Sequence, residues 1–427
     1  MLIFWQECKY ILRSRFLWVV MMLGIFVYCF FSISNFGSFK DTLTASFLYT
    51  QEHGKTFSTR EDANAYIKLY LQNTESGKLL ADALEKAGLE DIVDMPVERI
   101  MNYQNDPEIK EKLDQLAESD PSALSMIYMY LRNIQAPLDK IEPVIELEED
   151  EEKAYWEGIM IPKTMPEWKK ELLMEQGYEN LREQSLLQKG NTEFLPLTQI
   201  TGGGWDWFDD QFGMMGFGLM WAASLILAGM IAARSLGGSF QNQMPGMLYT
   251  QKKGRKTALY KVRSVMAVSG GIYLALSLVF TLVCILVFRL DLYWDVSLAA
   301  MTTTRFPITI GGYWLFQLGV GLAAVLIMTL VFCAAMMFTR SFFAGSAISV
   351  GVSLLLLGLI ANVPAAQNSF LIMGSPIGLF LKSGQFLQER FLFSVLPHFE
   401  GVMLLIWCGS AAVLGAVGFM RFRKAAL

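Results

Sequence analysis

Six long apolar segments, none of which contains Asp, Glu, Lys or Arg, constrain the fold of this 427-residue chain more than any other feature. About 20 helical residues are needed to cross a hydrocarbon core about 30 Å thick, and a charge at its centre costs at least about 2.5–3.5 kcal/mol. Each segment is therefore predicted to be a membrane-spanning helix. The segments are 16–36, 213–233, 265–288, 312–338, 342–363 and 402–420.

Lys and Arg gather on one side of these spans, which predicts the orientation, because the cytoplasmic loops of membrane proteins are enriched in both. One side carries 14 of them, with Glu7 as its only acidic residue, whereas the loops opposite carry Arg289, Arg305, Lys382 and Arg390. We therefore expect a multi-pass protein of the plasma membrane with both termini, including the tail 421–427, in the cytoplasm. The 14 are Lys9, Arg13, Arg15, Arg234, Lys252, Lys253, Arg255, Lys256, Lys261, Arg263, Arg340, Arg421, Arg423 and Lys424.

Residues 37–210, between the first two spans, are predicted to form an acidic extracellular domain. They hold 17 Lys and Arg against 35 Asp and Glu, a charge of −18, whereas the rest of the chain holds 18 basic and 5 acidic residues. The net charge of −5 is the sum of these two unlike parts.

The acidic domain is predicted to be helical. Ser58 precedes Glu61 by the three residues of a capping box, and Asp106 and Asp120, each followed by proline, match an N-cap with proline at the first helical position. The fold class predicted is therefore an all-α membrane protein with six spans, an N-terminal interfacial helix over 1–15 and a helical extracellular domain. The apolar face expected after the capping box comprises Tyr66, Ile67, Tyr70 and Leu71.

No chemistry-bearing constellation stands out in the sequence. Gly54-Lys55-Thr56 resembles the end of a phosphate-binding loop, but Tyr49 occupies the position of its required first glycine. The acidic run 146–152 could bind a cation, although a solvated face is the favoured interpretation. We predict no catalytic, cofactor-binding or metal-binding residues, no enzymatic activity of the chain by itself, and no nucleic-acid partner.

The predicted cytoplasmic loop 234–264 is the most informative stretch. Its residues 240–250 form a short amphipathic segment in which Met244, Met247 and Leu248 share one face, and a basic turn and the start of a helix follow. From the residues alone this is an interfacial helix in a basic loop.

The order of motifs in this loop resembles that of permeases of the type-two ABC exporter superfamily. The matching residues are Gly246-Met247-Leu248-Tyr249-Thr250, Lys253-Gly254-Arg255 and Lys261. The N-terminus is similar to the amphipathic elbow helix of that family, with Glu7, Arg13, Ser14 and Phe16 in its pattern. The six spans fit as well, as does segment 364–399, where the family often has extracellular or re-entrant helices. The insertion 37–210 occurs in a subset of such permeases.

The resemblance implies that the loop is a coupling helix docked on a separate ATPase subunit. It implies that this chain binds no cofactor, while ATP and Mg²⁺ bind two partner ATPases, and that a second permease copy or a paralogue completes a dimer in the lipid bilayer. The residues expected to contact the ATPase are Glu7, Gln241, Gln243, Met244, Met247, Leu248, Tyr249, Thr250, Arg255 and Lys261.

Three functions remain open from the sequence. The first is an exporter permease for a peptide, an antimicrobial or an amphipathic, lipid-like cargo. The second is a membrane receptor or sensor whose extracellular domain binds a ligand, although six spans exceed what an anchor needs. The third is a membrane-bound enzyme acting outside the cell, against which the lack of a catalytic constellation weighs.

Overall fold

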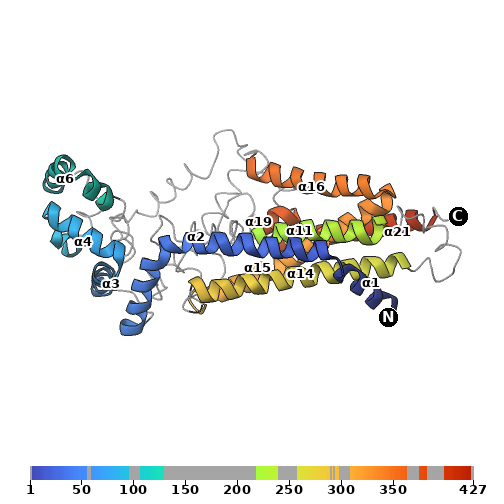
Figure 1. Cartoon of the computed structure of the whole chain (residues 1–427), viewed down its shortest axis with the longest axis horizontal. Coiled ribbons are helices and arrows are strands. Elements are labelled where there is room, and N and C mark those ends of the chain that lie inside the picture. Colours follow the sequence, from blue (N-terminus) through green and yellow to red (C-terminus); the bar gives the residue numbers. More distant parts are fainter. Residues whose placement is uncertain are drawn as a thin grey trace, which may run out of the picture. The chain divides into compact units, whose positions relative to one another are not determined.

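The computed structural model describes residues 2–54, 59–95, 106–128, 218–238, 257–288, 291, 294–297, 308–362, 375–381 and 399–424. Nearly all of them are helical (Figure 1), and a single bridge between Ser297 and Thr309 is the β pairing found among them. The prediction of an all-α protein is therefore confirmed for the described part of the chain. Its elements are α1 (Leu2–Leu12), α2 (Arg15–His53), α3 (Arg60–Asn73), α4 (Glu75–Ala87), η1 (Glu90–Asp94), α6 (Pro107–Ser119), α11 (Gly218–Ala232), η4 (Ala233–Gly237), α14 (Thr257–Phe288), α15 (Ile310–Thr339), α16 (Phe342–Asn362), α19 (Pro376–Leu381) and α21 (Phe399–Lys424).

Four of the described helices are long and apolar enough to cross a membrane, which indicates a membrane protein. A fifth span is counted if the pair Ile3–Leu12 and Leu17–Val27, which meet at an angle of 57°, acts as one. The apolar stretch Phe342–Leu355 in α16 is shorter. The prediction of six spans and of their sidedness stays a prediction. The four helices contain the stretches Met220–Gly237, Thr257–Leu286, Ile310–Thr339 and Gly401–Arg421.

The helices run past the limits of the apolar segments. α14 begins at Thr257, ahead of the predicted start of its span at residue 265, and α2 continues to His53 beyond residue 36. The residues added to α14 include Ala258, Leu259 and Lys261, which are good helix formers, so the helix continues where the apolar run does not.

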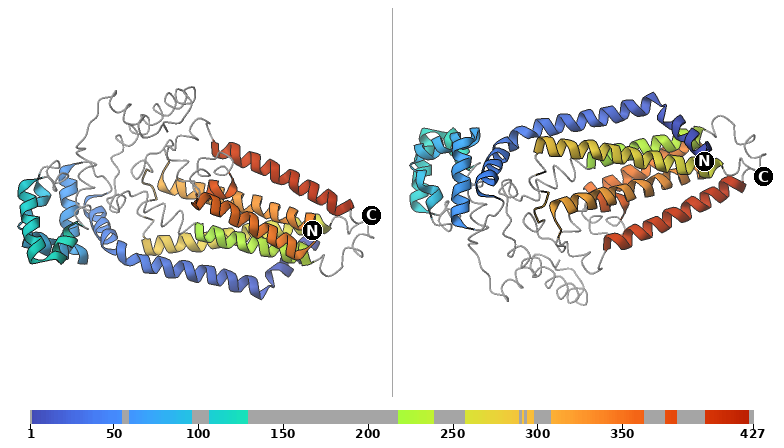
Figure 2. Two further views of the ribbon diagram at one scale, coloured as in Figure 1. Left: turned by 90° about the horizontal axis from the view of Figure 1, so that it is seen from above. Right: turned by 90° about the horizontal axis from the view of Figure 1, so that it is seen from below.

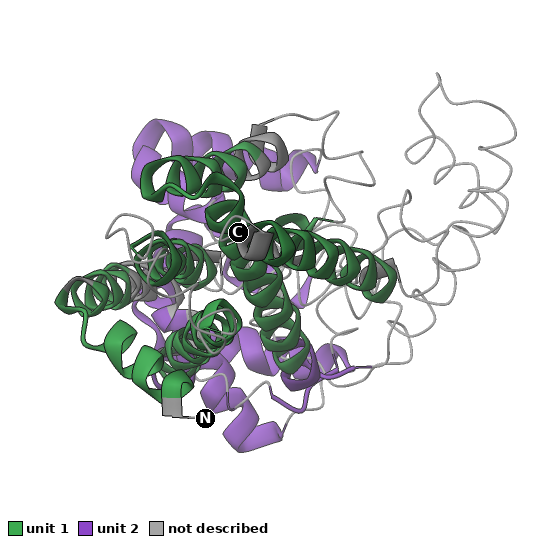
Figure 3. Cartoon of the chain, turned by 90° about the vertical axis from the view of Figure 1, so that its right-hand side faces the viewer, with its two compact units in different colours: residues 1–31, 211–283, 314–427 green, residues 32–210, 284–313 purple. Residues whose placement is uncertain are grey.

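The chain divides into two compact units (Figure 3). The first unit comprises Met1–Phe31, Gln211–Val283 and Trp314–Leu427, and the second comprises Ser32–Asp210 and Cys284–Tyr313. The predicted extracellular domain 37–210 falls in the second unit, which also takes in the connection between α14 and α15. The assignment of that unit to the outside of the cell stays a prediction.

In the first unit, α11, α14 and α15 run alongside one another (Figure 2). Aromatic residues join α14 to α15, because the ring of Phe280 stacks on Trp314 with their centroids 5.1 Å apart. Trp314 Nε1 donates to Thr281 Oγ1 at 3.0 Å, and the Tyr273 hydroxyl donates to the Leu318 carbonyl at 3.3 Å. Such bonds satisfy the polar tips of buried aromatic residues that would otherwise lie unpaired in an apolar interior.

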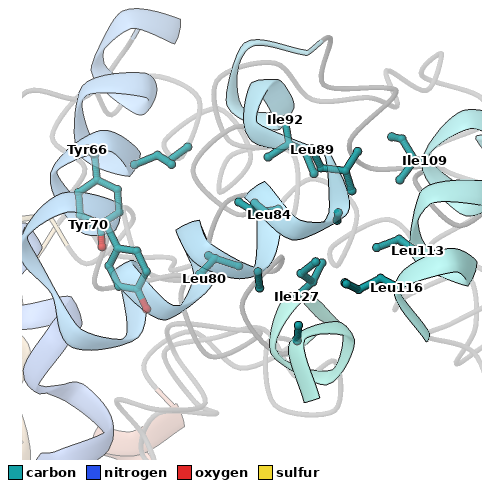
Figure 4. Close-up of a cluster of buried hydrophobic side chains, with 14 of the residues drawn as sticks. Tyr66, Tyr70, Leu80, Leu84, Leu89, Ile92, Ile109, Leu113, Leu116 and Ile127 are labelled. Carbon is teal, nitrogen blue, oxygen red and sulfur yellow. The ribbon is translucent and has the colours of Figure 1, made fainter. Parts of the chain in front are cut away.

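The second unit has its own apolar core, in which side chains of α3, α4, η1, α6 and the helical residues 121–128 converge (Figure 4). The apolar face predicted for α3 is confirmed, since Tyr66, Ile67 and Tyr70 are buried and Leu71 packs against them. Further core residues are Leu80, Leu84, Leu89, Ile92, Ile109, Leu113, Leu116 and Ile127.

The capping box of α3 lies one residue later than predicted. Thr59, and not Ser58, is the N-cap: its hydroxyl accepts from the Asp62 N–H, and Asp62 Oδ2 accepts from the Thr59 N–H at 2.9 Å. The predicted pair, Ser58 and Glu61, and the observed pair, Thr59 and Asp62, both have the three-residue spacing of a capping box. Asp62 Oδ1 also accepts from the hydroxyl of the buried Tyr49 at 3.1 Å, a contact that the local pattern does not contain.

Both predicted Asp-Pro caps are confirmed. Asp106 Oδ1 accepts from the N–H groups of Glu108 and Ile109, with Pro107 in the first turn of α6. Asp120 Oδ1 accepts from the Ala123 N–H at 3.1 Å, and its other oxygen accepts from Lys86 Nζ at 2.9 Å.

Acid is expected to destabilise the second unit through Asp120. The Ser122 hydroxyl, then Lys86 and the Ala123 N–H, donate hydrogen bonds that hold the pKa of the Asp120 carboxyl well below its usual range. A depressed pKa in the folded chain stabilises the fold above the unfolded value near 3.9, and that stabilisation is lost as the pH falls through the folded pKa. Hydrogen exchange of α4 and α6, corrected for intrinsic rates, should show faster opening below about pH 4.

The matched variants are Asp120→Asn and Asp114→Asn. Asp120→Asn should lower the stability of the second unit near neutral pH and flatten the dependence of that stability on acid. Asp114→Asn, at an exposed position on α6, should keep the wild-type acid profile. An unchanged acid profile in Asp120→Asn would contradict the assignment.

Candidate coupling site

Two of the ten residues predicted to contact an ATPase, Glu7 and Lys261, belong to the described part of the chain. The other eight, Gln241, Gln243, Met244, Met247, Leu248, Tyr249, Thr250 and Arg255, lie in the segment 239–256, outside the described residues. The described geometry therefore concerns the two flanks of that segment, η4 before it and the start of α14 after it.

Glu7 and Lys261 form an ion pair. The Lys261 Nζ lies 3.6 Å from Glu7 Oε1, and the two side chains are only 16% and 19% exposed. The same ammonium donates to the Ser235 carbonyl of η4 at 3.0 Å. Lys261 thus ties three elements together: its own helix α14, the N-terminal helix α1 and the turn that ends α11.

Two further hydrogen bonds hold α1 against these flanks. The Ser264 hydroxyl on α14 donates to the Phe4 carbonyl of α1 at 3.1 Å. Arg234 of η4 donates to Ser14 Oγ at 2.6 Å, and its guanidinium lies over the Tyr10 ring, 4.9 Å from the centroid. Cation–π contacts of this kind contribute about 0.5–1 kcal/mol at exposed sites.

The corner between α1 and α2 is closed by its own bonds. Trp18 Nε1 donates to the Leu12 carbonyl at 2.8 Å, and the Ser14 N–H donates to the Ile11 carbonyl at 3.1 Å. These bonds satisfy carbonyl groups that the end of a helix leaves without an internal partner. The result is a fixed bend that keeps α1 beside the ends of α11 and α14 (Figure 1).

The turn η4 has π-helical geometry over Ala233–Gly237. Single π turns inside α-helices are rare and occur frequently at functional sites. Gly237 lets this turn approach α16 closely, since a Cβ built on it would lie 3.1 Å from Phe342 Cδ2 and 3.2 Å from Phe342 Cα. The π turn carries both Arg234 and Ser235, which makes it the centre of the polar contacts at this site.

The structure brings Glu7 and Lys261 into contact, which the sequence did not predict. Glu7 and Lys261 were both expected to contact a partner, and here they contact each other. Ser235 and Ser264 were not singled out at all. Spacing offers one signal on α1, because Glu7 and Tyr10 are three residues apart and so share one face of that helix. The partners on η4 and α14 carry no comparable local signal.

No protein-family model, no curated protein and no solved structure matches this chain. The class that the described helices define is a helical membrane protein with two compact units. Among the described residues no three His, Cys, Asp or Glu side chains gather as metal ligands would, and the prediction that the chain has no metal site stays a prediction.

Proposed function

We propose that the chain is the permease subunit of an ATP-driven ABC exporter of the type-two class. In this proposal six spans cross the plasma membrane, both termini are cytoplasmic and residues 37–210 form an extracellular helical domain. The permease works as a dimer with two ATPase subunits, and it exports a peptide, an antimicrobial or an amphipathic, lipid-like cargo. ATP and Mg²⁺ bind the ATPases.

The observation that supports the proposal most is the polar contact of α1 with both flanks of segment 239–256. An ATPase that grips this segment would displace η4 and the start of α14 together, because Lys261 bonds Ser235 across the gap at 3.0 Å. α1 would follow through Glu7 and Ser14. Helices are stiff along their axes, so a displacement of these ends reaches the apolar parts of α11 and α14 directly.

The composition of the spans supports an exporter driven by a partner. Carriers driven by protons or ions usually hold Asp, Glu or His within the membrane, where these residues relay or bind the coupling ion. The six predicted spans contain no Asp, Glu or His. This composition supports transport powered from outside the chain, such as by ATP hydrolysis in another subunit.

If a neighbouring gene encodes an ABC ATPase, co-expression of that ATPase with this chain tests the proposal. The two proteins should purify together from detergent, and Arg255→Glu or the double variant Met247→Ala/Leu248→Ala should release the ATPase, because these residues lie in the predicted docking segment. Arg305→Glu, the same charge reversal in a predicted extracellular loop, serves as the control. Full retention of the ATPase by both docking variants would rule out the assignment of segment 239–256.

Deletion of residues 60–200 distinguishes the exporter hypothesis from the receptor hypothesis. An exporter should keep its ATPase after the deletion and change its cargo handling. A receptor should lose its ligand response and bring down no ATPase with or without the deletion.

A further inference from the structure

A cavity of about 610 Å³ lies within the first unit, between the α1–α2 corner, α11 and α16. Its volume falls in the range of about 300–1,000 Å³ that is usual for pockets holding small molecules. Most of its wall is apolar and includes Leu225 and Ile226 of α11, Phe332 of α15, and Val350 and Leu354 of α16. All these side chains belong to helices with apolar stretches, so the cavity offers a long hydrocarbon surface.

One cation stands at the end of this apolar surface. Arg234 lines the cavity, is exposed, and lies one turn from the end of the apolar stretch Met220–Gly237. Its recorded contacts are the hydrogen bond to Ser14 and the ring of Tyr10, and no carboxylate of the described residues pairs with it. A guanidinium has five N–H donors, so most of them remain for a ligand.

A row of serines on α16 adds polar groups to the opposite wall. Ser349 and Ser353 donate back to carbonyls of their own helix, those of Gly345 and Ser349, at 2.8 and 3.0 Å. Ser346 also lines the cavity, but its Oγ is buried and has no hydrogen-bond partner among the described residues. An unpaired buried hydroxyl is costly, and a ligand oxygen within reach of another Ser346 rotamer would remove that cost.

We propose that this cavity binds an anionic phospholipid of the surrounding bilayer, with an acyl chain along α11 and α16 and its phosphate against Arg234. An acyl chain matches the apolar wall, and a net negative head group matches a cation that the described residues leave unneutralised. A zwitterionic lipid carries its own cation beside the phosphate and gains less from Arg234. The lipid is a resident ligand, and the proposal holds whether or not the chain transports a cargo.

Native mass spectrometry of the full chain, released from nanodiscs, tests the head-group preference. The probes are phosphatidylglycerol and phosphatidylcholine with the same acyl chains. The wild-type chain should retain phosphatidylglycerol in preference, and Arg234→Gln should reduce that preference about fivefold, which is the usual contribution of one basic residue at a membrane surface. Arg263→Gln is the matched control, because Arg263 is exposed on α14 near the same end of the bundle and does not line the cavity.

Two more variants separate the lipid site from folding. Ser14→Ala removes the hydrogen bond of Arg234 but keeps its charge, so the preference should survive. Gly229→Leu should reduce retention of both lipids, since a Cβ on Gly229 already lies 3.8 Å from the Phe332 ring and a longer side chain must occupy the cavity. Equal loss in Arg234→Gln and Arg263→Gln, equal retention of the two lipids by the wild type, or full retention in Gly229→Leu would each overturn the proposal.

Discussion

Replacing Lys261 with Met is expected to release α1 from the ends of α11 and α14. The substitution leaves Glu7 without its recorded cation and removes the donor to the Ser235 carbonyl. Exposed ion pairs contribute about 0.2–1 kcal/mol, and breaking a buried one costs about 3–5 kcal/mol. The side chains are 16% and 19% exposed, so we expect a cost between these limits, about 1.5–3 kcal/mol.

Hydrogen exchange of the full-length chain in detergent measures this effect at α1. The amides of α1 should exchange about ten to a hundred times faster in Lys261→Met, because each 1.4 kcal/mol corresponds to a factor of about ten. Glu7→Gln should have the smaller effect, since Lys261 keeps its bond to Ser235. Arg263→Met, two residues along the same helix and exposed, should leave α1 unchanged. Equal exchange in Lys261→Met and Arg263→Met would show that the ion pair does not hold α1.

Leu84→Ala is expected to open the core of the second unit. Leu84 is 2% exposed and lies at the centre of the cluster that α3, α4 and α6 share (Figure 4). Removal of a buried leucine side chain costs about 2–5 kcal/mol, because transfer energy is lost and a cavity remains. That is a large fraction of the stability of a small domain, about 5–15 kcal/mol in total.

The same helix provides the control. Leu79 on α4 is 54% exposed, so Leu79→Ala makes an identical chemical change with an expected effect within about 0.5 kcal/mol. Hydrogen exchange should accelerate across α3, α4 and α6 in Leu84→Ala and stay at the wild-type rate in Leu79→Ala. Similar exchange in the two variants would show that the cluster is not a cooperative core.

The length of the uncharged apolar segments predicted the long helices well, because such a run leaves few alternatives to a helix. Apolar length marks the spans and not the whole helices, which extend past them. The start of α14 at Thr257 depends on residues such as Ala258 and Lys261, whose helix propensity is high although the stretch is not uniformly apolar. The capping box of α3 was misplaced by one residue because Ser58–Glu61 and Thr59–Asp62 have the same spacing, and the bond from Tyr49 on α2 to Asp62 is not part of the local pattern.

The contacts of the candidate coupling site could not be predicted from local patterns. Ser264 meets the Phe4 carbonyl and Arg234 meets Ser14 across more than 200 residues of sequence. Resemblance to a family placed Glu7 and Lys261 at one functional surface but did not indicate that they pair. A single sequence carries helix-period signals and end signals, whereas contacts of this range depend on how the helices pack.

The bond between Lys261 and the Ser235 carbonyl also has a consequence for the number of residues that the chain can hold between η4 and α14. The 3.0 Å bond between Lys261 Nζ and the Ser235 carbonyl joins η4 to the start of α14 directly, so the described residues hold these two helical ends together. The entropic cost of closing a flexible loop rises by only about 0.6 kcal/mol for each doubling of its length. Residues inserted between η4 and α14 are therefore expected to cost the fold little, because the bond that joins these two elements does not depend on how many residues lie between them.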